Sequence, residues 1–322
     1  ATSSGNITLN PSGNGVTASS TINGNSLTIT NGGAVDLNNT VTVPNGFSSS
    51  GTSFDNTGAT ITTTNTAISI NHTGAVTVGA ALSAGNGAIS VVSTGSSVTL
   101  SAAVTGGSGG VSVASNTSTV TIGAPINVSS GTVSIDSGAG TTITAAGDIT
   151  ATGAAPVNFG QTLAGALSTA GDVTTVGGPV RFYRAVTLTG NVNLDSGSAS
   201  VTFDQDVSGG FSLTINSGAG NVMFSSTIGG GADPTGLSFT STGNVTFTGS
   251  VNIGGNLTVS ANNVNVNNGI YGSATGNVQI TQSGVLTILD TTSAGDDTTA
   301  DINIIGSFIQ ISGGGGSSIS LQ

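Results

Sequence analysis

Short runs of alternating apolar and polar residues recur along the chain. Typical runs are Ile7-Thr8-Leu9, Val98-Thr99-Leu100 and Val201-Thr202-Phe203, in which two apolar residues flank one polar residue. Alternation with a period of two, built largely from β-branched residues, is typical of a β-strand with one buried face. The pattern therefore predicts an all-β fold made of many short strands.

The starting positions of these runs define a repeat. From Val76 to Thr142 the runs begin at intervals of 6, 7 and 9 residues, three times over, which gives units of 22 residues. From Val180 to Val222 the intervals are 6, 6 and 9, which gives units of 21. The repeat is clearest in residues 76–141 and 180–263. Three short strands and three turns per unit match one coil of a parallel β-helix, or β-solenoid, in which each strand pairs with its equivalent one coil away.

This repeat length predicts roughly 15 coils, stacked about 4.8 Å apart in a rod on the order of 70 Å long. We expect one continuous solenoid over residues 1–312, followed by a Gly-rich linker and a terminal strand in residues 313–322. Residues 229–234, Gly-Gly-Gly-Ala-Asp-Pro, are expected to form a loop inserted at one corner. An antiparallel sandwich would instead show longer strands joined by hairpins, with turns every 8–12 residues.

Similar turn sequences follow several predicted strands. Asp136-Ser137-Gly138, Asp195-Ser196-Gly197 and Asn216-Ser217-Gly218 each combine Asp or Asn with a glycine, which supplies the positive φ that tight corners require. We expect all three to occupy the same corner of the coil, with ladders of Asn, Ser and Thr side chains running from coil to coil.

The chain contains few side chains that could act as catalysts or metal ligands. The 322 residues include only two basic side chains, one His and no Cys or Trp, and the formal net charge is −11. Such a charge argues against nucleic acid as a partner, because phosphates require a basic surface. The apolar share of 35% argues against bulk disorder. No apolar run approaches the roughly 20 residues needed to cross a bilayer, and the opening Ala-Thr-Ser indicates a processed or excised chain.

Three phrases resemble the β-helix repeats of filamentous-haemagglutinin-like proteins. They are Gly220-Asn221-Val222-Met223-Phe224, the stretch from Gly243 to Val251, and Gly255-Asn256-Leu257-Thr258-Val259. Such repeats occur in bacterial surface adhesins and autotransporter-type exoproteins. The resemblance covers about residues 76 to 290 and implies a right-handed parallel β-helix that is secreted to the cell surface.

Parallel β-helices also include polysaccharide-degrading enzymes, which need paired carboxylates. Asp204 and Asp206, with both arginines one coil earlier, are the strongest candidates, although exposed strand and corner positions explain them better. His72 could serve a Ser-His-Asp triad, but Asn71-His72-Thr73-Gly74 favours a solvated turn. We therefore expect no enzyme and no cofactor.

A calcium site is the other chemistry we considered. Asp296, Asp297 and Asp301 cluster near a predicted turn, and acidic oxygens can ligate calcium. A solvated acidic loop is the better interpretation, because the glycine-rich calcium-binding repeat of secreted β-rolls is missing. We expect no metal at this cluster.

The chain carries one candidate contact patch. Arg181, Tyr183 and Arg184 lie together in Val180-Arg181-Phe182-Tyr183-Arg184, where alternation places Phe182 inward and Arg181 and Tyr183 outward. Arg and Tyr are favoured at interfaces. The patch is expected to face Asp204 or Asp206, and a local salt bridge explains it equally well.

The two ends carry the assembly candidates. Neither end shows a capping element, and both contain alternating apolar residues: Ile7 and Leu9 at the start, Ile319 and Leu321 at the end. Exposed strand edges pair readily with further strands. We therefore expect copies of the same chain to be partners.

These observations favour a secreted, extracellular structural protein, either a subunit or a segment of a β-solenoid fibre assembled by end-to-end or strand-complementing contacts. The first alternative is a rod-like surface adhesin that binds glycans or other cell-surface ligands. A polysaccharide-degrading enzyme is the third hypothesis. Ice binding is the fourth, although the Thr positions are less regular than a flat ice-binding array needs.

Overall fold

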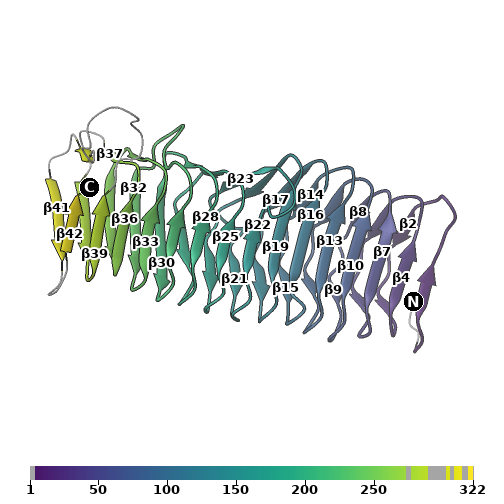
Figure 1. Ribbon diagram of the computed structural model, residues 1–322. Coiled ribbons are helices and arrows are strands. Elements are labelled where there is room, and N and C mark those ends of the chain that lie inside the picture. Colours follow the sequence, from purple (N-terminus) through teal and green to yellow (C-terminus); the bar gives the residue numbers. More distant parts are fainter. Residues whose placement is uncertain (1–3, 273–276, 289–301, 305–307, 314–317, 322) are drawn as a thin grey trace. The chain divides into compact units, whose positions relative to one another are not determined.

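The computed structural model describes residues 4–272, 277–288, 302–304, 308–313 and 318–321. Contacts divide the chain into two compact units, residues 1–167 (unit 1) and 168–322 (unit 2). In each unit the described residues form short β-strands and no helix, so none of them forms a helix that could cross a membrane. Figure 1 shows the strands of each unit as rows of arrows, purple to teal for unit 1 and green to yellow for unit 2.

Unit 1 builds three parallel sheets from every third strand. The first sheet contains β1 (Ile7–Leu9), β4 (Leu27–Thr30), β7 (Phe47–Gly51), β10 (Ile68–His72), β13 (Ile89–Ser93), β16 (Val111–Ser115), β19 (Val133–Ser137) and β22 (Val157–Phe159). The second contains β2 (Val16–Ala18), β5 (Val35–Leu37), β8 (Phe54–Asp55), β11 (Val76–Val78), β14 (Val98–Leu100), β17 (Thr119–Ile122) and β20 (Gly140–Ile143). The third contains β3 (Ile22–Asn23), β6 (Val41–Thr42), β9 (Ile61–Thr62), β12 (Leu82–Ser83), β15 (Val104–Gly106), β18 (Ile126–Val128) and β21 (Ile149–Ala151).

Unit 2 follows the same plan with longer strands in its third sheet. Its first sheet contains β25 (Val180–Phe182), β28 (Val201–Phe203), β31 (Val222–Phe224), β33 (Asn244–Phe247), β36 (Asn263–Val266), β39 (Val285–Ile288) and β42 (Ser318–Leu321). The second-sheet position holds β26 (Val186–Leu188), β29 (Val207–Ser208), β34 (Val251–Ile253), β37 (Ile270–Gly272) and β40 (Ile302–Ile304). The third contains β24 (Val173–Thr175), β27 (Val192–Asp195), β30 (Ser212–Gly218), β32 (Gly236–Ser241), β35 (Asn256–Ala261), β38 (Asn277–Gln282) and β41 (Phe308–Gly313). β23 (Ala166–Thr169) spans the boundary of the two units.

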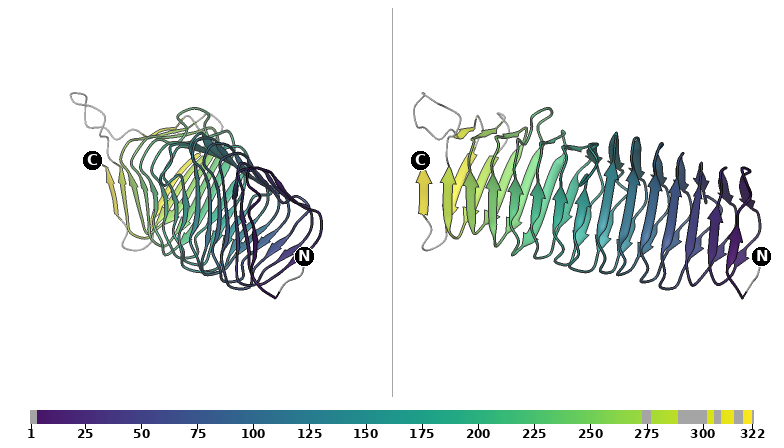
Figure 2. Two further views of the ribbon diagram at one scale, coloured as in Figure 1. Left: turned by 90° about the vertical axis from the view of Figure 1, so that its right-hand side faces the viewer. Right: turned by 45° about the vertical axis from the view of Figure 1, so that its right-hand side comes forward.

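The prediction of an all-β parallel solenoid is confirmed. In the left view of Figure 2, successive coils of unit 1 follow one another with nearly the same outline. The first-sheet position holds eight strands in unit 1 and seven in unit 2, and the exact number of coils stays a prediction. The right-handed sense of the coil and the single continuous solenoid over residues 1–312 stay predictions.

The counted repeat agrees with the strand register except at one position. Val76 pairs with Val98 and Val98 with Val120, as the 22-residue spacing predicts. Val120, however, pairs with Thr141, not with the predicted Thr142. A one-residue slip exchanges the faces of a strand. Thr141 must point inward because Ile143, two residues later, does so, and Thr142 is exposed.

The cores of the two units are columns of inward residues, one residue per coil. Unit 1 is filled mainly by Val, Ile and Leu. Unit 2 contains a column of phenylalanines with nearly parallel rings: Phe182 to Phe203 at 4.5 Å, Phe203 to Phe224 at 4.8 Å and Phe224 to Phe247 at 5.6 Å between centroids. Offset stacking of this kind stabilises aromatic pairs by about 0.5–1.5 kcal/mol beyond the area that they bury.

The predicted corner ladder is confirmed in unit 2. Asp195 pairs with Asn216 in register, and each side chain accepts a hydrogen bond from the amide of the glycine two residues later. Those glycines, Gly197 and Gly218, have positive φ angles of 65° and 50°. The ladder therefore satisfies the turn amides and places glycine where φ requires it.

The third turn does not belong to this ladder. Asp136 and Ser137 end β19 in the first sheet of unit 1, whereas Asp195 and Asn216 lie in a third sheet. Asp136 is buried, and its carboxylate accepts hydrogen bonds from the Thr162 amide and hydroxyl and from the Leu163 amide. Expecting one shared corner was wrong, because Asp136 serves the insertion around residues 160–165.

Candidate functional site

The predicted contact patch is formed by β25 and β28, the first strand pair in the first sheet of unit 2. Arg181 lies on β25 and pairs in register with Thr202 on β28. Phe182 is buried and Arg181 is exposed, as alternation predicts, while Tyr183 and Arg184 are half-buried just after the strand. The strand thus anchors the patch through Phe182 and presents the Arg181 guanidinium outward.

The Arg181 guanidinium makes two kinds of contact. Its Nε donates to Asp204 Oδ2 at 3.0 Å and its Nη2 donates to Asp204 Oδ1 at 3.2 Å. The guanidinium carbon lies 4.6 Å from the centroid of the Tyr183 ring. These hydrogen bonds to the Asp204 carboxylate raise the pKa of Arg181 above its usual value. The predicted meeting of Arg181 with Asp204 is therefore confirmed.

Asp206 is engaged elsewhere. Its Oδ1 accepts hydrogen bonds from the Ser226 hydroxyl at 2.5 Å and from the Thr227 amide at 3.1 Å. The two carboxylates therefore have different partners, since Asp204 binds Arg181 and Asp206 binds the next coil. This geometry supports a surface ion pair beside an aromatic ring, suited to polar contacts with a ligand.

His72 lies where the sequence analysis did not place it. It is the last residue of β10 and is 1% exposed, so the expectation of a solvated turn was wrong. Its Nε2 lies 3.0 Å from the Ser49 hydroxyl, and its ring centroid lies 5.4 Å from that of Phe54. Burial lowers the pKa of His72 from 6.5 to about 4, and the nearby Ser53 backbone offsets part of this decrease. The sequence does predict this burial, because the alternation that begins with Ile68 and Ile70 places His72 inward.

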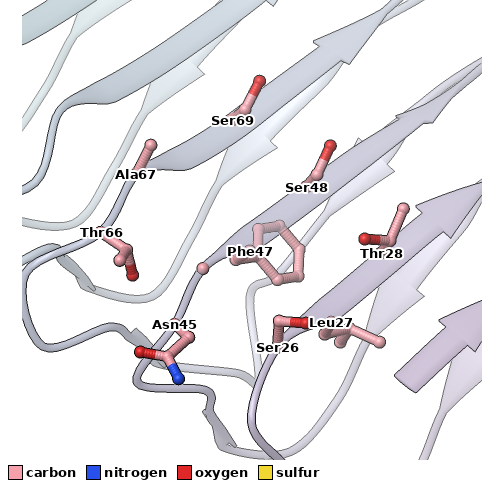
Figure 3. A pocket seen from close by; sticks show the side chains of 10 residues that line it. Ser26, Leu27, Thr28, Asn45, Phe47, Ser48, Thr66, Ala67 and Ser69 are labelled. Atoms are coloured by element: carbon pink, nitrogen blue, oxygen red, sulfur yellow. The ribbon is translucent and has the colours of Figure 1, made fainter. Parts of the chain in front are cut away.

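A shallow groove of about 320 Å³ crosses the first sheet of unit 1. Figure 3 shows Thr28, Ser48 and Ser69 side by side on β4, β7 and β10, with Asn45 and Thr66 at the near end of these strands. All are uncharged hydroxyl or amide side chains. The groove can hydrogen-bond water or a hydroxylated ligand, but it contains no ionisable group.

The first coil carries two of the assembly candidates. Ile7, Leu9 and Val16 are half-buried, whereas their register partners Leu27, Ile29 and Val35 are 0%, 1% and 1% exposed. Within the described residues, no strand pairs with the outer edge of β1, β2 or β3. A depression of about 520 Å³, lined by Leu9, Pro11 and Val16 among others, adjoins these residues. This end of unit 1 therefore presents inward-type residues without a covering coil.

The remaining candidates lie at the other end of the chain. Ile319 and Leu321 belong to β42, which pairs in parallel with β39 of the same chain, and their side chains lie outside the described part. Asp296, Asp297 and Asp301 also lie outside it. In the part of the chain that the structure describes, no group of three or more His or Asp side chains could hold a metal ion.

Comparison with known proteins adds no relative. No protein-family model, no curated protein and no solved structure matches this chain. The β-solenoid architecture itself is thus the level at which the chain can be assigned.

Proposed function

We propose that this protein is a non-catalytic structural protein, a subunit or segment of an extracellular β-solenoid fibre. The observation that carries the proposal is the stacking of equivalent coils, in which strands pair in parallel with their equivalents in the next coil. Ile7, Leu9 and Val16 are placed to face inward, yet remain half-buried because nothing described covers them. A further coil stacked on β1, β2 and β3 would bury these side chains and pair the three strand edges at once.

A coil-on-coil contact of this kind joins different surfaces of the two partners. Such heterologous contacts generate open filaments when they do not close into a ring. The apolar positions of β1 and the outward Thr8 repeat the alternation of every coil, so a coil from a second copy has the right chemistry. Deleting residues 313–322 tests whether the terminal strand contributes, as the strand-complementing form of the proposal requires.

The test is electron microscopy of purified protein with a change at the open coil. Ile7→Asp with Leu9→Asp places two carboxylates on the inward face and should abolish filaments. Thr8→Asp adds a charge to the same strand on its outward face and should leave filaments intact. Isolated particles from the unchanged protein at every concentration, or filaments from the double variant, would reject the proposal.

The resemblance to filamentous-haemagglutinin-like repeats supports the secreted form of this proposal. The asparagines of its Gly-Asn-apolar phrases lie at or just before the start of a strand and bond from coil to coil. The Asn244 backbone amide donates to Asn221 Oδ1 at 2.8 Å, and Asn244 Oδ1 accepts a hydrogen bond from Asn263 Nδ2 in the next coil at 2.8 Å. The phrase thus has a physical role in stacking coils. A right-handed coil and a bacterial cell-surface location are what membership of that family would imply.

A surface adhesin is the second candidate, favoured by the patch on unit 2. Arg181 stacked on Tyr183 and paired with Asp204 offers a ring edge, donors and acceptors within one strand pair. Such a group fits a hydroxylated ligand such as a glycan. Glycan-array binding that Tyr183→Ala removes, in a protein that stays monomeric, would favour the adhesin over the fibre.

A further inference from the structure

Two inward columns in the first sheet of unit 1 change their chemistry on adjacent strands, β7 and β10. His72 stands in a column whose next members are serines, and Ser49 interrupts a column that is otherwise apolar. In register, the first column is Gly51, His72, Ser93, Ser115 and Ser137. The second is Ile29, Ser49, Ile70 and Val91.

These departures fit one another. The Ser49 hydroxyl lies 3.0 Å from His72 Nε2, so the polar residue in the apolar column supplies a partner for the ring. A Cβ on Gly51 would lie 3.3 Å from His72 Cε1 and 2.5 Å from the Gly33 carbonyl oxygen, so glycine leaves room for the ring. Phe54 packs against the other side. Ser49, Gly51 and Phe54 together form a site shaped for one imidazole.

The site leaves one ring nitrogen unsatisfied. In the described part of unit 1, His72 Nδ1 is buried and makes no hydrogen bond of normal geometry, and the nearby Ser53 backbone offsets only part of the effect of burial on the ring. The serines of the same column differ, because the Ser93 hydroxyl donates to the Gly74 carbonyl and the Ser115 hydroxyl donates to the Ser96 carbonyl, both at 2.6 Å. A buried polar atom without a partner destabilises the fold. These coils are therefore less stable with histidine at position 72 than they would be with serine there.

We propose that the His72 corner is an acid-sensitive lock, which holds β7 and β10 together at neutral pH and opens this level of unit 1 when His72 is protonated. The imidazolium would be a buried charge without a counterion. Among β7, β8 and β13, the strands packed around the ring, Asp55 is the only charged residue. Its carboxylate is on the outward face of β8 and accepts hydrogen bonds from the Thr57 amide and hydroxyl.

The direction of the pH effect follows from linkage. The pKa of His72 is lowered from 6.5 to about 4 in the folded protein. The unfolded chain therefore binds the proton more readily, and the stability of this level, fully present above pH 6.5, is lost as the pH falls toward 4. A shift of this size changes the local opening constant by on the order of a hundred-fold between pH 7 and pH 4.

Opening this level would expose the edges of β7 and β10. Free edges of this length pair with strands of other chains. Acid would thus add a pairing site in the middle of unit 1. This inference does not depend on the proposed fibre, which concerns the first coil.

Because His72 is the only histidine, its Cε1 proton gives one unambiguous NMR signal. We expect no titration of the folded-state signal near pH 6.5, and a change only near pH 4, together with opening. A signal that titrates near pH 6.5 in the folded protein would overturn the proposal.

Amide hydrogen exchange, corrected for the chemical exchange rate at each pH, then measures the opening. In the unchanged protein, amides of β7 and β10 should open on the order of a hundred-fold more often at pH 4 than at pH 7. His72→Ser, the residue found in the following coils, should reduce this ratio to a few-fold. Asp55→Asn is the matched control and should keep the full ratio. An unchanged ratio in His72→Ser, or its loss in Asp55→Asn, would show that His72 is not the sensor.

Discussion

The two units have the same type of coil but differ in the side chains that fill its core and line its surface. Unit 1 stacks aliphatic side chains and buries a polar column that includes His72 and Ser93. Unit 2 stacks phenylalanine rings and places an exposed ion pair, Arg181 with Asp204, on its outward face. Because each coil of a solenoid contacts only its neighbours, each column can adopt its own chemistry. The coil determines which positions face inward, and local matching between successive coils determines what fills them.

The phenylalanine column of unit 2 offers the largest effect. Phe203→Ala should cost about 3–5 kcal/mol, because it leaves a cavity between two stacked rings. Arg181 and Arg184 are the only trypsin sites in the chain, and they flank the partner ring Phe182. Trypsin should therefore cut the variant much faster than the unchanged protein. Trypsin should cut the control variant Thr202→Ala, which is changed on the outward face of the same strand, at the original rate. Equal rates for all three proteins would mean that the column is not essential to local stability.

In unit 1 the corresponding weak point is polar. Asp136→Ala should cost about 2–3 kcal/mol, because three hydrogen-bond donors of Thr162 and Leu163 lose a buried carboxylate. Faster amide exchange in residues 160–165 is the expected result. Ser134→Ala, two residues earlier on the outward face of β19, is the control. If the insertion kept its protection without Asp136, its conformation would be set by its own backbone.

Alternation and spacing were sufficient to predict the parallel solenoid, the inward position of Phe182 and the loop at residues 229–234. They work because burial alternates along every strand and equivalent strands stack. The same rules failed at Thr142, where one residue less in a turn changes the face that a side chain joins. They also failed at Asp136, because similar turn sequences follow strands of different sheets. They also missed the Ser49–His72 pair, since those residues meet only after two strands adopt a register. Arg181 and Asp204 could be brought together in advance because 23 positions separate them, close to one coil.

The glycine corner of unit 2 should give a smaller effect. Gly218→Ala puts a Cβ at a φ of +50° and 1.9 Å from the Gly197 carbonyl oxygen, so backbone must move. A loss of about 2 kcal/mol is expected, measured by thermal unfolding. Gly210→Ala is the control, because nothing lies within 4 Å of its Cβ and its φ is not positive. A neutral Gly218→Ala variant would show that the corner relaxes more freely than the stacked turns indicate.

The smallest effect should come from the ion pair that distinguishes the surface of unit 2. Arg181→Ala should cost less than about 1 kcal/mol, because the Arg181 side chain is 48% exposed and an exposed pair loses most of its Coulomb energy to solvent. The variant leaves Arg184 as the only trypsin site, so its cleavage rate reports opening at this corner without a competing cut. Asp204→Asn should give an equally small change, and the double variant should add no more than a few tenths of a kcal/mol. A loss above about 2 kcal/mol would assign the pair a structural role. A small loss in stability with complete loss of glycan binding would instead assign the patch to recognition.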